Sequence, residues 1–253
     1  MKKIRKIIIA VLILVIIGCV GYIVNYVSTQ NKNQQVYDEL KDKAVKKPKP
    51  KPQEKQESQV EIPIDFAALQ AENPDIYAWI QIEGTNIAYP VVQSATDNSY
   101  YLNYTVDHQY GLPGSIYTEN WNAKDFSDYN TVIYGHDMLD GSMFENLHNY
   151  SDPQFMNGHP EVIIYTPEKK LTYQIFAAVV YEDKHILYSY DFTEKSQRQS
   201  YLDSIFDARN MGNVYRDDVS VTADDRLLTL STCIGSQPDK RFLVEAVLVS
   251  EEE

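Results

Sequence analysis

Cysteine is almost absent from this sequence of 253 residues, where only Cys19 and Cys233 occur. Cys19 lies within a long apolar segment near the N-terminus, so the rest of the chain cannot form a disulfide of its own. Cys233 is therefore a free thiol. In an exported protein a free thiol is open to oxidation unless it is used or buried, and Cys233 is the first candidate for a reactive group.

Basic residues are scarce after residue 60. Residues 61–253 contain 11 Lys and Arg against 31 Asp and Glu, a net charge of −20, whereas residues 1–60 contain 12 against 5. Nucleic-acid binding depends on clustered Lys and Arg, so this acidic balance argues against it. The His and Cys spacings of zinc sites are absent, as are phosphate-binding and Gly-x-Ser-x-Gly patterns. We expect neither a metal nor another cofactor.

One long apolar run is present, at residues 7–27. Its length matches the roughly 20 residues that span a bilayer, and the basic residues within 1–6 place the N-terminus in the cytoplasm. We expect a cytoplasmic tail, a single transmembrane helix and an extracellular remainder. Two alternatives stay open. A cleaved signal peptide would have a shorter apolar region and a cleavage site, and a lipoprotein signal at residues 16–19 would be followed by polar residues.

Residues 28–60 form a predicted spacer between the apolar run and the rest of the chain. Residues 30–40 can extend the helix for some turns, but residues 46–52 alternate lysine with proline. Proline lacks the backbone N–H that a helix or a central strand needs. The spacer is therefore predicted to be an extended Lys/Pro-rich stalk, with about 3 Å per residue.

Residues 61–253 have the size of one folded domain. Abundant Tyr, Val, Ile and Thr favour β-structure, and short strands with few helices between them predict a closed or nearly closed β-barrel. The expected strands are residues 76–82, 86–92, 115–118, 130–134, 161–166, 171–181, 227–233 and 241–248. The expected helices are residues 66–72 capped by Asp65, short stretches at 143–148 and 153–157, and a longer helix at 194–210 capped by Thr193.

Side-chain alternation decides where Cys233 points. The strand at 227–233 carries its leucines at 228 and 230 on one face, so Cys233 lies on the opposite face. In the strand at 241–248 the face that begins with Phe242 is wholly apolar, so Arg241 falls on the other face. If the two strands pair across the Gly-Ser-Gln-Pro-Asp loop, the thiol and the guanidinium lie near each other on one wall of a groove. The alternative is a buried structural cysteine.

A thiol needs a base to react at neutral pH, and five histidines are available. His136 follows the apolar strand at 130–134 after one glycine, a strand-end position where a rigid scaffold can present a catalytic group. The remaining four stand in polar turns or at helix ends, where solvated surface is the default. They are His108, His148, His159 and His185.

Three sequence motifs together resemble the class B sortases of Gram-positive bacteria. They are Thr-Leu-Ser-Thr-Cys at 229–233, Arg-Phe-Leu-Val from Arg241, and Asn-Thr-Val-Ile-Tyr-Gly-His-Asp-Met at 130–138. The similarity continues at residues 98–102, 114–117 and 140–144, and it includes the long helix before the last strands that distinguishes class B from class A. Thr-Leu-x-Thr-Cys alone is a weak motif, but in order with the other two and a membrane anchor it is specific.

The resemblance implies an eight-stranded sortase-type β-barrel, with an N-terminal helix and a long helix before the last strands, that acts as a cysteine transpeptidase. Such enzymes cleave the sorting signal of a surface protein after Thr, hold the acyl chain as a thioester, and pass it to an amine of a cell-wall precursor or a pilin lysine. Cys233 is then the expected nucleophile, His136 the general acid and base, and Arg241 the residue that holds the oxyanion. By the same resemblance, Asn98, Leu102 and Ser231 are expected to line the sorting-signal groove.

Two positions depart from the pattern of this family. Asp137 stands where relatives often have Asn, and Ile234 stands where some carry a polar or acidic residue. These departures concern the substrate and not the class of reaction. Two other functions remain alternatives: a hydrolytic cysteine peptidase of the cell envelope, which would place no amine in the product, and a non-enzymatic membrane-tethered binding domain, in which Cys233→Ala would be silent.

Overall fold

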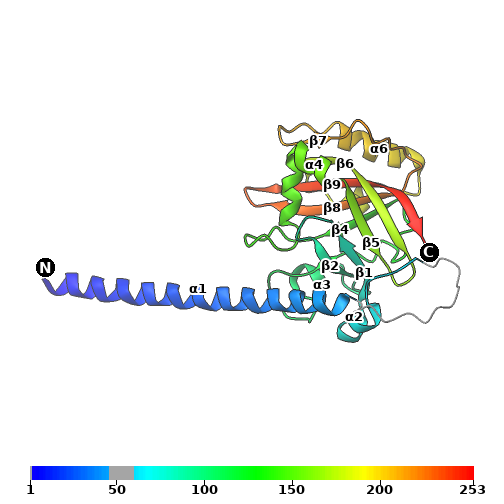
Figure 1. Ribbon diagram of the computed structural model, residues 1–253. Helices are drawn as coiled ribbons and strands as arrows, with labels where there is room; N and C mark the ends of the chain where they lie inside the picture. Colours follow the sequence, from blue (N-terminus) through cyan, green and yellow to red (C-terminus); the bar gives the residue numbers. More distant parts are fainter. Residues whose placement is uncertain (1, 46–59) are drawn as a thin grey trace.

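The computed structural model describes residues 2–45 and 60–253 (Figure 1). The chain begins with one continuous helix, α1 (Lys2–Ala44), which is long and apolar enough to cross a membrane. The sequence predicts an extended stalk at residues 28–60, but residues 28–44 belong to this helix. The helical extension expected at residues 30–40 is therefore present. The Lys/Pro run at 46–52 lies outside the described residues.

The last turns of α1 pack against the folded domain. Tyr37, Leu40 and Ala44 are buried in the main hydrophobic core. The hydroxyl of Tyr37 donates a hydrogen bond to the backbone carbonyl of Gly114, in a loop of the domain. The packed unit therefore includes the end of α1 and begins well before residue 61.

Eight strands close into the expected barrel, in the order β5-β1-β2-β3-β4-β8-β9-β6, and pairing of β5 with β6 completes the circle. They are β1 (Ile76–Gln81), β2 (Ala88–Val92), β3 (Ile116–Tyr117), β4 (Asn130–Tyr134), β5 (Glu161–Tyr165), β6 (Lys170–Glu182), β8 (Leu227–Ile234) and β9 (Gln237–Glu252). A further short strand, β7 (Val214–Tyr215), pairs with β6 alone. The loop expected between β8 and β9 is shorter than predicted, because β9 already begins at Gln237.

In the described part of the chain, α2 (Phe66–Glu72) precedes β1, and five short helical elements join the strands: α3 (Tyr100–Asn103), the 3₁₀ helix η1 (Glu145–Ser151), α4 (Pro153–Gly158), α5 (Ile186–Ser189) and α6 (Lys195–Phe206). Asp65 caps α2 as predicted, because its carboxylate accepts from the Ala68 N–H at 3.1 Å. The prediction for α6 was too long at both ends, and the predicted cap is wrong. Thr193 donates its hydroxyl hydrogen to Asp191 at 2.6 Å instead of capping the helix.

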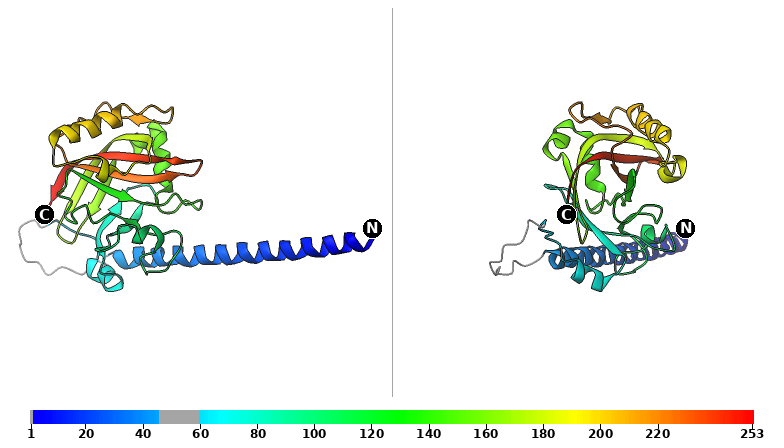
Figure 2. Two further views of the ribbon diagram at one scale, coloured as in Figure 1. Left: turned by 180° about the vertical axis from the view of Figure 1, so that it is seen from behind. Right: turned by 90° about the vertical axis from the view of Figure 1, so that its right-hand side faces the viewer.

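Most of β8 (residues 227–232) and the central part of β9 (residues 242–247) are buried on both faces. Leucines 228 and 230 point into the barrel, as alternation predicted. The other face also carries apolar residues, and these pack under α6 against Tyr201 and Ile205. Figures 1 and 2 show α6 on the side of the barrel opposite α1. The outer face becomes accessible only where β8 ends, at Cys233.

A buried polar cluster lies between α6 and the barrel. The carboxylate of Glu245 is fully buried and accepts hydrogen bonds from the Tyr201 hydroxyl at 2.7 Å and the Thr229 hydroxyl at 2.9 Å. Burial raises the pKa of Glu245 to about 7, although these two hydrogen bonds act in the opposite direction. The cluster ties α6 to β8 and β9, close to the strand ends that carry Cys233.

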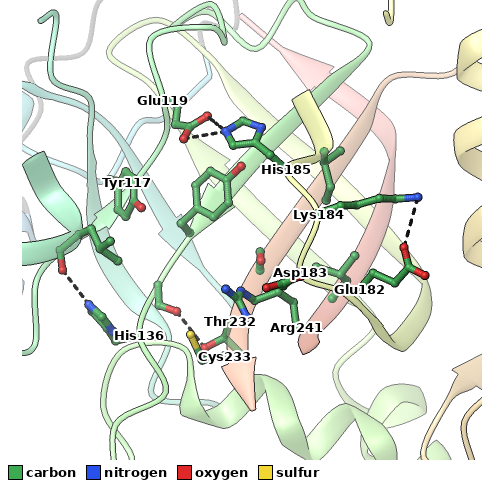
Figure 3. A pocket seen from close by; sticks show the side chains of 16 residues that line it. Tyr117, Glu119, His136, Glu182, Asp183, Lys184, His185, Thr232, Cys233 and Arg241 are labelled. Atoms are coloured by element: carbon green, nitrogen blue, oxygen red, sulfur yellow. Dashed lines mark hydrogen bonds and ion pairs between the residues drawn. The ribbon is translucent and has the colours of Figure 1, made fainter. Parts of the chain in front are cut away.

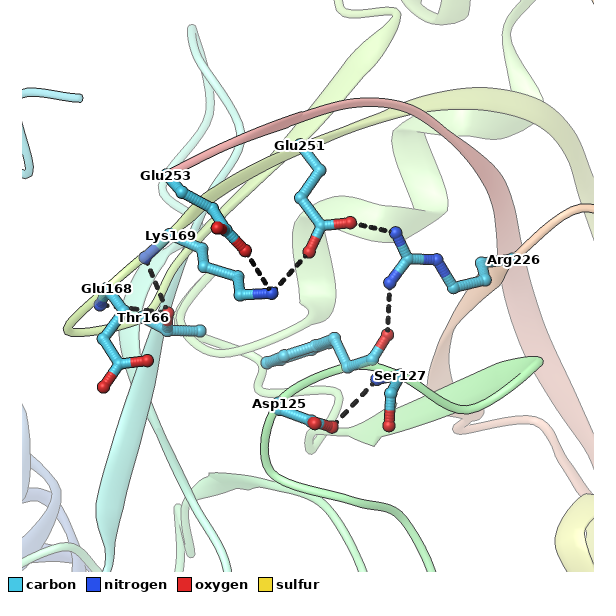
Figure 4. Close-up of polar contacts among 9 residues, drawn as sticks. Asp125, Ser127, Thr166, Glu168, Lys169, Arg226, Glu251 and Glu253 are labelled. Carbon is cyan, nitrogen blue, oxygen red and sulfur yellow. Dashed lines mark hydrogen bonds and ion pairs between the residues drawn. The ribbon is translucent and has the colours of Figure 1, made fainter. Parts of the chain in front are cut away.

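Ion pairs hold the C-terminal end of β9 (Figure 4). The ammonium nitrogen of Lys169 lies 2.8 Å from a carboxylate oxygen of Glu251 and 2.8 Å from one of Glu253. Arg226 pairs with the second oxygen of Glu251. Hydrogen bonds from Lys169 and Arg226 hold the pKa of Glu251 below its usual range. Since β8 and β9 are antiparallel, this end of the barrel is opposite the end that carries Cys233.

Candidate active site

Cys233 and Arg241 face each other across the β8–β9 hairpin. They are direct partners in the antiparallel register, and a register shift follows immediately after Cys233. Direct cross-strand partners lie on the same face of a sheet. The sulfur is exposed, so the alternative of a buried structural cysteine is wrong. The pairing predicted from alternation and loop length is confirmed.

The guanidinium of Arg241 is held by its own loop. One terminal nitrogen, Nη1, donates to the carbonyls of Pro238 at 3.0 Å and Lys240 at 2.8 Å. A guanidinium has five N–H donors in a planar fork, so donors on Nε and Nη2 remain for an oxygen that enters the site. The two loop carbonyls orient the fork before any substrate binds.

His136 stands on the neighbouring strand end. It follows β4, which runs parallel to β8 and pairs with it through Tyr134 and Ser231. The hydroxyl of Thr232 donates to the carbonyl of Gly135 at 2.8 Å, which anchors the backbone just before the histidine. Figure 3 shows the Cys233 sulfur between the His136 ring and the Arg241 guanidinium in this view.

The tautomer of His136 follows from its hydrogen bond. Its Nε2 lies 2.7 Å from the carbonyl oxygen of Leu102, and a carbonyl can only accept, so Nε2 carries a hydrogen. Nδ1 is then the nitrogen that can exchange a proton. Gly114 permits this close approach because it has φ +62°, and a Cβ there would lie 2.6 Å from the Leu102 oxygen and 3.1 Å from the His136 ring.

These side chains open into one pocket of about 220 Å³. Cys233, His136 and Arg241 all line it, together with the predicted groove residues Leu102 and Ser231. The pocket walls also include Tyr117 and Tyr134. Burial raises the pKa of both phenols far above the usual range, so they are neutral at physiological pH.

Asn98 is the one predicted site residue that does not line this pocket. Its side-chain oxygen accepts a hydrogen bond from the backbone N–H of Asn120 at 2.7 Å. That contact positions the loop after β3. A contact of Asn98 with substrate stays a prediction.

Two histidines, at positions where the sequence predicts solvated surface, reach the site. Nε2 of His185 lies 2.8 Å from a carboxylate oxygen of Glu119, and both residues line the pocket. Nε2 of His148 donates to the carbonyl of Cys233 at 3.1 Å and lies 3.4 Å from the Asp137 carboxylate. No local pattern could reveal these contacts, because each joins residues at least 11 positions apart.

Known proteins are similar to this chain in sequence. A family model described as "Sortase domain" matches residues 80–249. The chain is 34% identical over 209 residues to sortase B of Listeria monocytogenes, covering 81% of this chain and 71% of that protein. It is 31% identical over 245 residues to sortase B of Staphylococcus aureus, covering 96% of each.

A solved structure shows the same fold. The crystal structure of sortase B from B. anthracis, in complex with AAEK1, superposes with a TM-score of 0.71 at 31% identity. The match covers 87% of this chain and 98% of that one. Because the family model matches most of the chain and both relatives are more than 30% identical to it, this chain belongs to the sortase family, as a class B cysteine transpeptidase.

Proposed function

We propose that Cys233 is the nucleophile of this transpeptidase, His136 its general acid and base, and Arg241 its oxyanion donor. One observation supports this assignment above the others. Cys233 and Arg241 are register partners at the only exposed stretch of the outer β8 face, and His136 lies on the strand that pairs with β8. A carbonyl bound in this pocket can meet all three side chains.

In the first half-reaction the Cys233 thiolate attacks the carbonyl carbon of the threonine in a sorting signal. The carbonyl oxygen becomes an oxyanion, which the free Nε and Nη2 donors of Arg241 stabilise. The C–N bond then breaks, and the imidazolium of His136 gives its Nδ1 proton to the leaving amine. The products are a thioester on Cys233 and a released C-terminal peptide.

In the second half-reaction an amine attacks the thioester. His136 takes a proton from this amine through Nδ1, and the C–S bond breaks to restore the thiolate. The new amide joins the surface protein to the acceptor, which we propose is an amine of a cell-wall precursor or a lysine of a pilin. Leu102 and Ser231, which line the pocket, are proposed to contact the sorting signal.

We further propose that α1 anchors the enzyme in the cell membrane with a single pass. The apolar residues 7–27 have the length of one bilayer span, and the basic residues before them keep the N-terminus cytoplasmic. The catalytic barrel then lies outside the cell, where sorting signals and cell-wall amines meet.

The thioester is the test of the proposed mechanism. Purified full-length enzyme is screened against peptides of the Asn-Pro-x-Thr and Leu-Pro-x-Thr-Gly types, without an amine acceptor, and intact mass is measured. An acyl adduct on Cys233 should accumulate and be discharged by hydroxylamine as a hydroxamate. Cys233→Ala should abolish the adduct and His136→Ala should nearly abolish it, whereas the matched control Cys19→Ala should leave it unchanged. If hydroxylamine yields no hydroxamate with any peptide, the proposed reaction is wrong.

A further inference from the structure

The loops around the active site all leave the barrel at one end. β4, β6 and β8 run in the same direction, because β4 is parallel to β8 and β9 is antiparallel to both β6 and β8. The segment that follows β4 and the β8–β9 turn therefore share one end. β3 is antiparallel to β4, so the loop before β3, at residues 104–115, reaches the same end. We call this the active-site end.

Helix α1 runs past the active-site end on its way to the N-terminus. Figures 1 and 2 show the β8–β9 turn pointing along the barrel toward the side where α1 extends. A direct contact fixes the level of the loop before β3 along α1: the side-chain amide of Asn33 donates to the carbonyl of Leu112 at 2.5 Å. Two further contacts from α1 to the domain, at Tyr37 and Ala44, prevent the barrel from swinging freely around the helix.

The position of Asn33 sets the height of this end above a membrane. Asn33 follows the apolar run at 7–27 by six residues, which is about 9 Å of helix at 1.5 Å per residue. The polar headgroup layer of a bilayer is roughly 5–8 Å thick on each side. The loop that contains Leu112 is thus held at the outer edge of that layer, and a tilt of α1 toward the barrel side brings it nearer.

Large apolar side chains project from the loops at this end. Tyr110 is 76% exposed and Leu112 is 42% exposed, both in the loop before β3. Leu139 is fully exposed in the loop that follows His136. Exposed apolar side chains at the height of the headgroup layer can enter the membrane interface. Tyrosine is enriched there because its ring is apolar and its hydroxyl is polar.

Electrostatic attraction does not explain such a contact. The same loops carry Asp107, Asp137 and Asp140, and acidic groups are repelled by anionic headgroups. The contact must therefore be apolar and must be assisted by the anchor. A tether of fixed length raises the effective concentration of the lipid surface, so a weak contact is sufficient.

We propose that the active-site end of the barrel rests on the outer surface of the membrane, with Tyr110, Leu112 and Leu139 in the headgroup layer. This inference rests on the proposed membrane anchoring by α1. Its consequence for the reaction is that the thioester on Cys233 is presented at the lipid surface, so an amine carried by a lipid-linked acceptor reaches it more readily than an amine in solution.

Lipid quenching of site-specific fluorophores tests the contact directly. Full-length protein with Cys19→Ser and Cys233→Ala receives one cysteine, at Tyr110 or Leu139, labelled with a nitrobenzoxadiazole dye and reconstituted in phosphatidylcholine nanodiscs. Glu168→Cys is the matched control, because this exposed residue lies in the β5–β6 turn at the opposite end. Nitroxide-labelled headgroups should quench the dyes at 110 and 139 at least threefold more than the dye at 168. Equal quenching at all three positions would refute the proposal.

A second experiment raises the barrel without touching its loops. Seven helix-forming residues inserted after Ser28 add about 10 Å and nearly two full turns, so α1 presents the same face to the barrel. In otherwise native enzyme, the rate of transfer to soluble triglycine should stay unchanged, while transfer to triglycine coupled to a phospholipid headgroup should fall at least fivefold. In the dye-labelled protein, quenching at 110 and 139 should be lost.

An unchanged ratio of the two rates in the insertion variant would contradict the proposal. Failure of the proposed anchoring or of the proposed transpeptidase residues would give other results. If the protein does not co-purify with nanodiscs, the membrane anchoring is wrong, and the proposed contact with the membrane is wrong as well. If transfer to soluble triglycine is absent as well, the transpeptidase assignment of the residues is wrong, while the quenching result still decides whether the active-site end contacts lipid.

Discussion

A histidine can exchange a proton only through the ring nitrogen that its neighbours leave free. In His136 that nitrogen is Nδ1, because Nε2 donates to the carbonyl of Leu102. Arg241 is prepared in a similar way, with one nitrogen committed to two loop carbonyls and the other donors free. At the scale of single residues, the site is organised by backbone carbonyls that orient each side chain before the substrate arrives.

The first prediction concerns the shape of the Arg241 side chain. Arg241→Lys should lower kcat/KM by about 10²–10³-fold, because an ammonium cannot hold the two loop carbonyls and an oxyanion with the planar fork of a guanidinium. Steady-state kinetics with a sorting peptide and an amine measures this, and Tm should be unchanged. Arg209→Lys is the control, since Arg209 is exposed and does not line the pocket. Near-native activity of Arg241→Lys would mean that backbone amides alone hold the oxyanion.

The second prediction concerns the buried carboxyl of Glu245. Its pKa is about 7 in the folded protein against an ordinary value of 4.5, so the folded state favours the protonated form. This contribution to stability is complete below pH 4.5 and is lost as pH rises through 7, by on the order of 3 kcal/mol. Urea unfolding of the wild type and Glu245→Gln between pH 5 and 8 should give a stability difference that changes with pH in favour of the variant.

Glu161→Gln is the control for that series, because Glu161 is a carboxylate exposed on β5. It should show no comparable pH-dependent difference from the wild type. A flat difference curve for Glu245→Gln would show that the buried carboxyl has an ordinary pKa in the folded protein.

At the scale of elements, α1 is part of the domain and more than a tether. Its buried Tyr37 holds the backbone of Gly114, and Gly114 lies against both the Leu102 carbonyl and the His136 ring. The end of the helix therefore supports the loop that orients the proposed general base. A flexible linker directly after residue 27 could not provide this support.

The third prediction follows from that contact. Tyr37→Phe removes the hydroxyl and leaves the buried carbonyl of Gly114 without its donor, which should cost about 1–3 kcal/mol of unfolding free energy. Hydrogen exchange should also increase in the loop before β3. Tyr188→Phe, at a side chain that is 81% exposed, should change neither quantity. Unaltered stability and exchange in Tyr37→Phe would mean that α1 does not brace this loop.

At the scale of the whole molecule, charge is divided between the two ends of the chain. Residues 1–60 are basic and residues 61–253 carry a net charge of −20. An acidic domain does not adhere to an anionic envelope by electrostatics. The proposed anchoring by the apolar run of α1 would instead place the barrel, through the length and direction of one helix.

The fourth prediction concerns that anchor. Full-length protein in a membrane fraction should resist extraction by 1 M salt, be released by detergent, and retain its N-terminal residues when sequenced. Deletion of residues 1–27 should release the protein into the soluble fraction, while Cys19→Ala should leave it membrane-bound. Lipid attached to Cys19, or an N-terminus that begins beyond it, would replace the transmembrane anchor with a lipoprotein or a cleaved signal.

Local sequence was sufficient to find the eight barrel strands, although not β7 or the early start of β9, and to place two site residues. Alternation has a period of two, so it assigned Cys233 and Arg241 to one face, and the short loop between their strands made them partners. The motif that contains His136 and the barrel fold also followed from order and resemblance. These features are determined by residues that are close together in the sequence, so they can be predicted from it.

Only the tertiary structure decided the features that join distant residues. The Leu102 carbonyl that determines the tautomer of His136 lies 34 positions before it in the chain. The carboxyl of Glu245 is buried under α6, a helix that precedes β8 and β9 in the sequence. The packing of α1 on the barrel was missed because few apolar residues of its end face inward, and the position of Asn98 depends on a loop 22 residues away. Local periodicity carries no information on such contacts, because they arise only when the barrel closes.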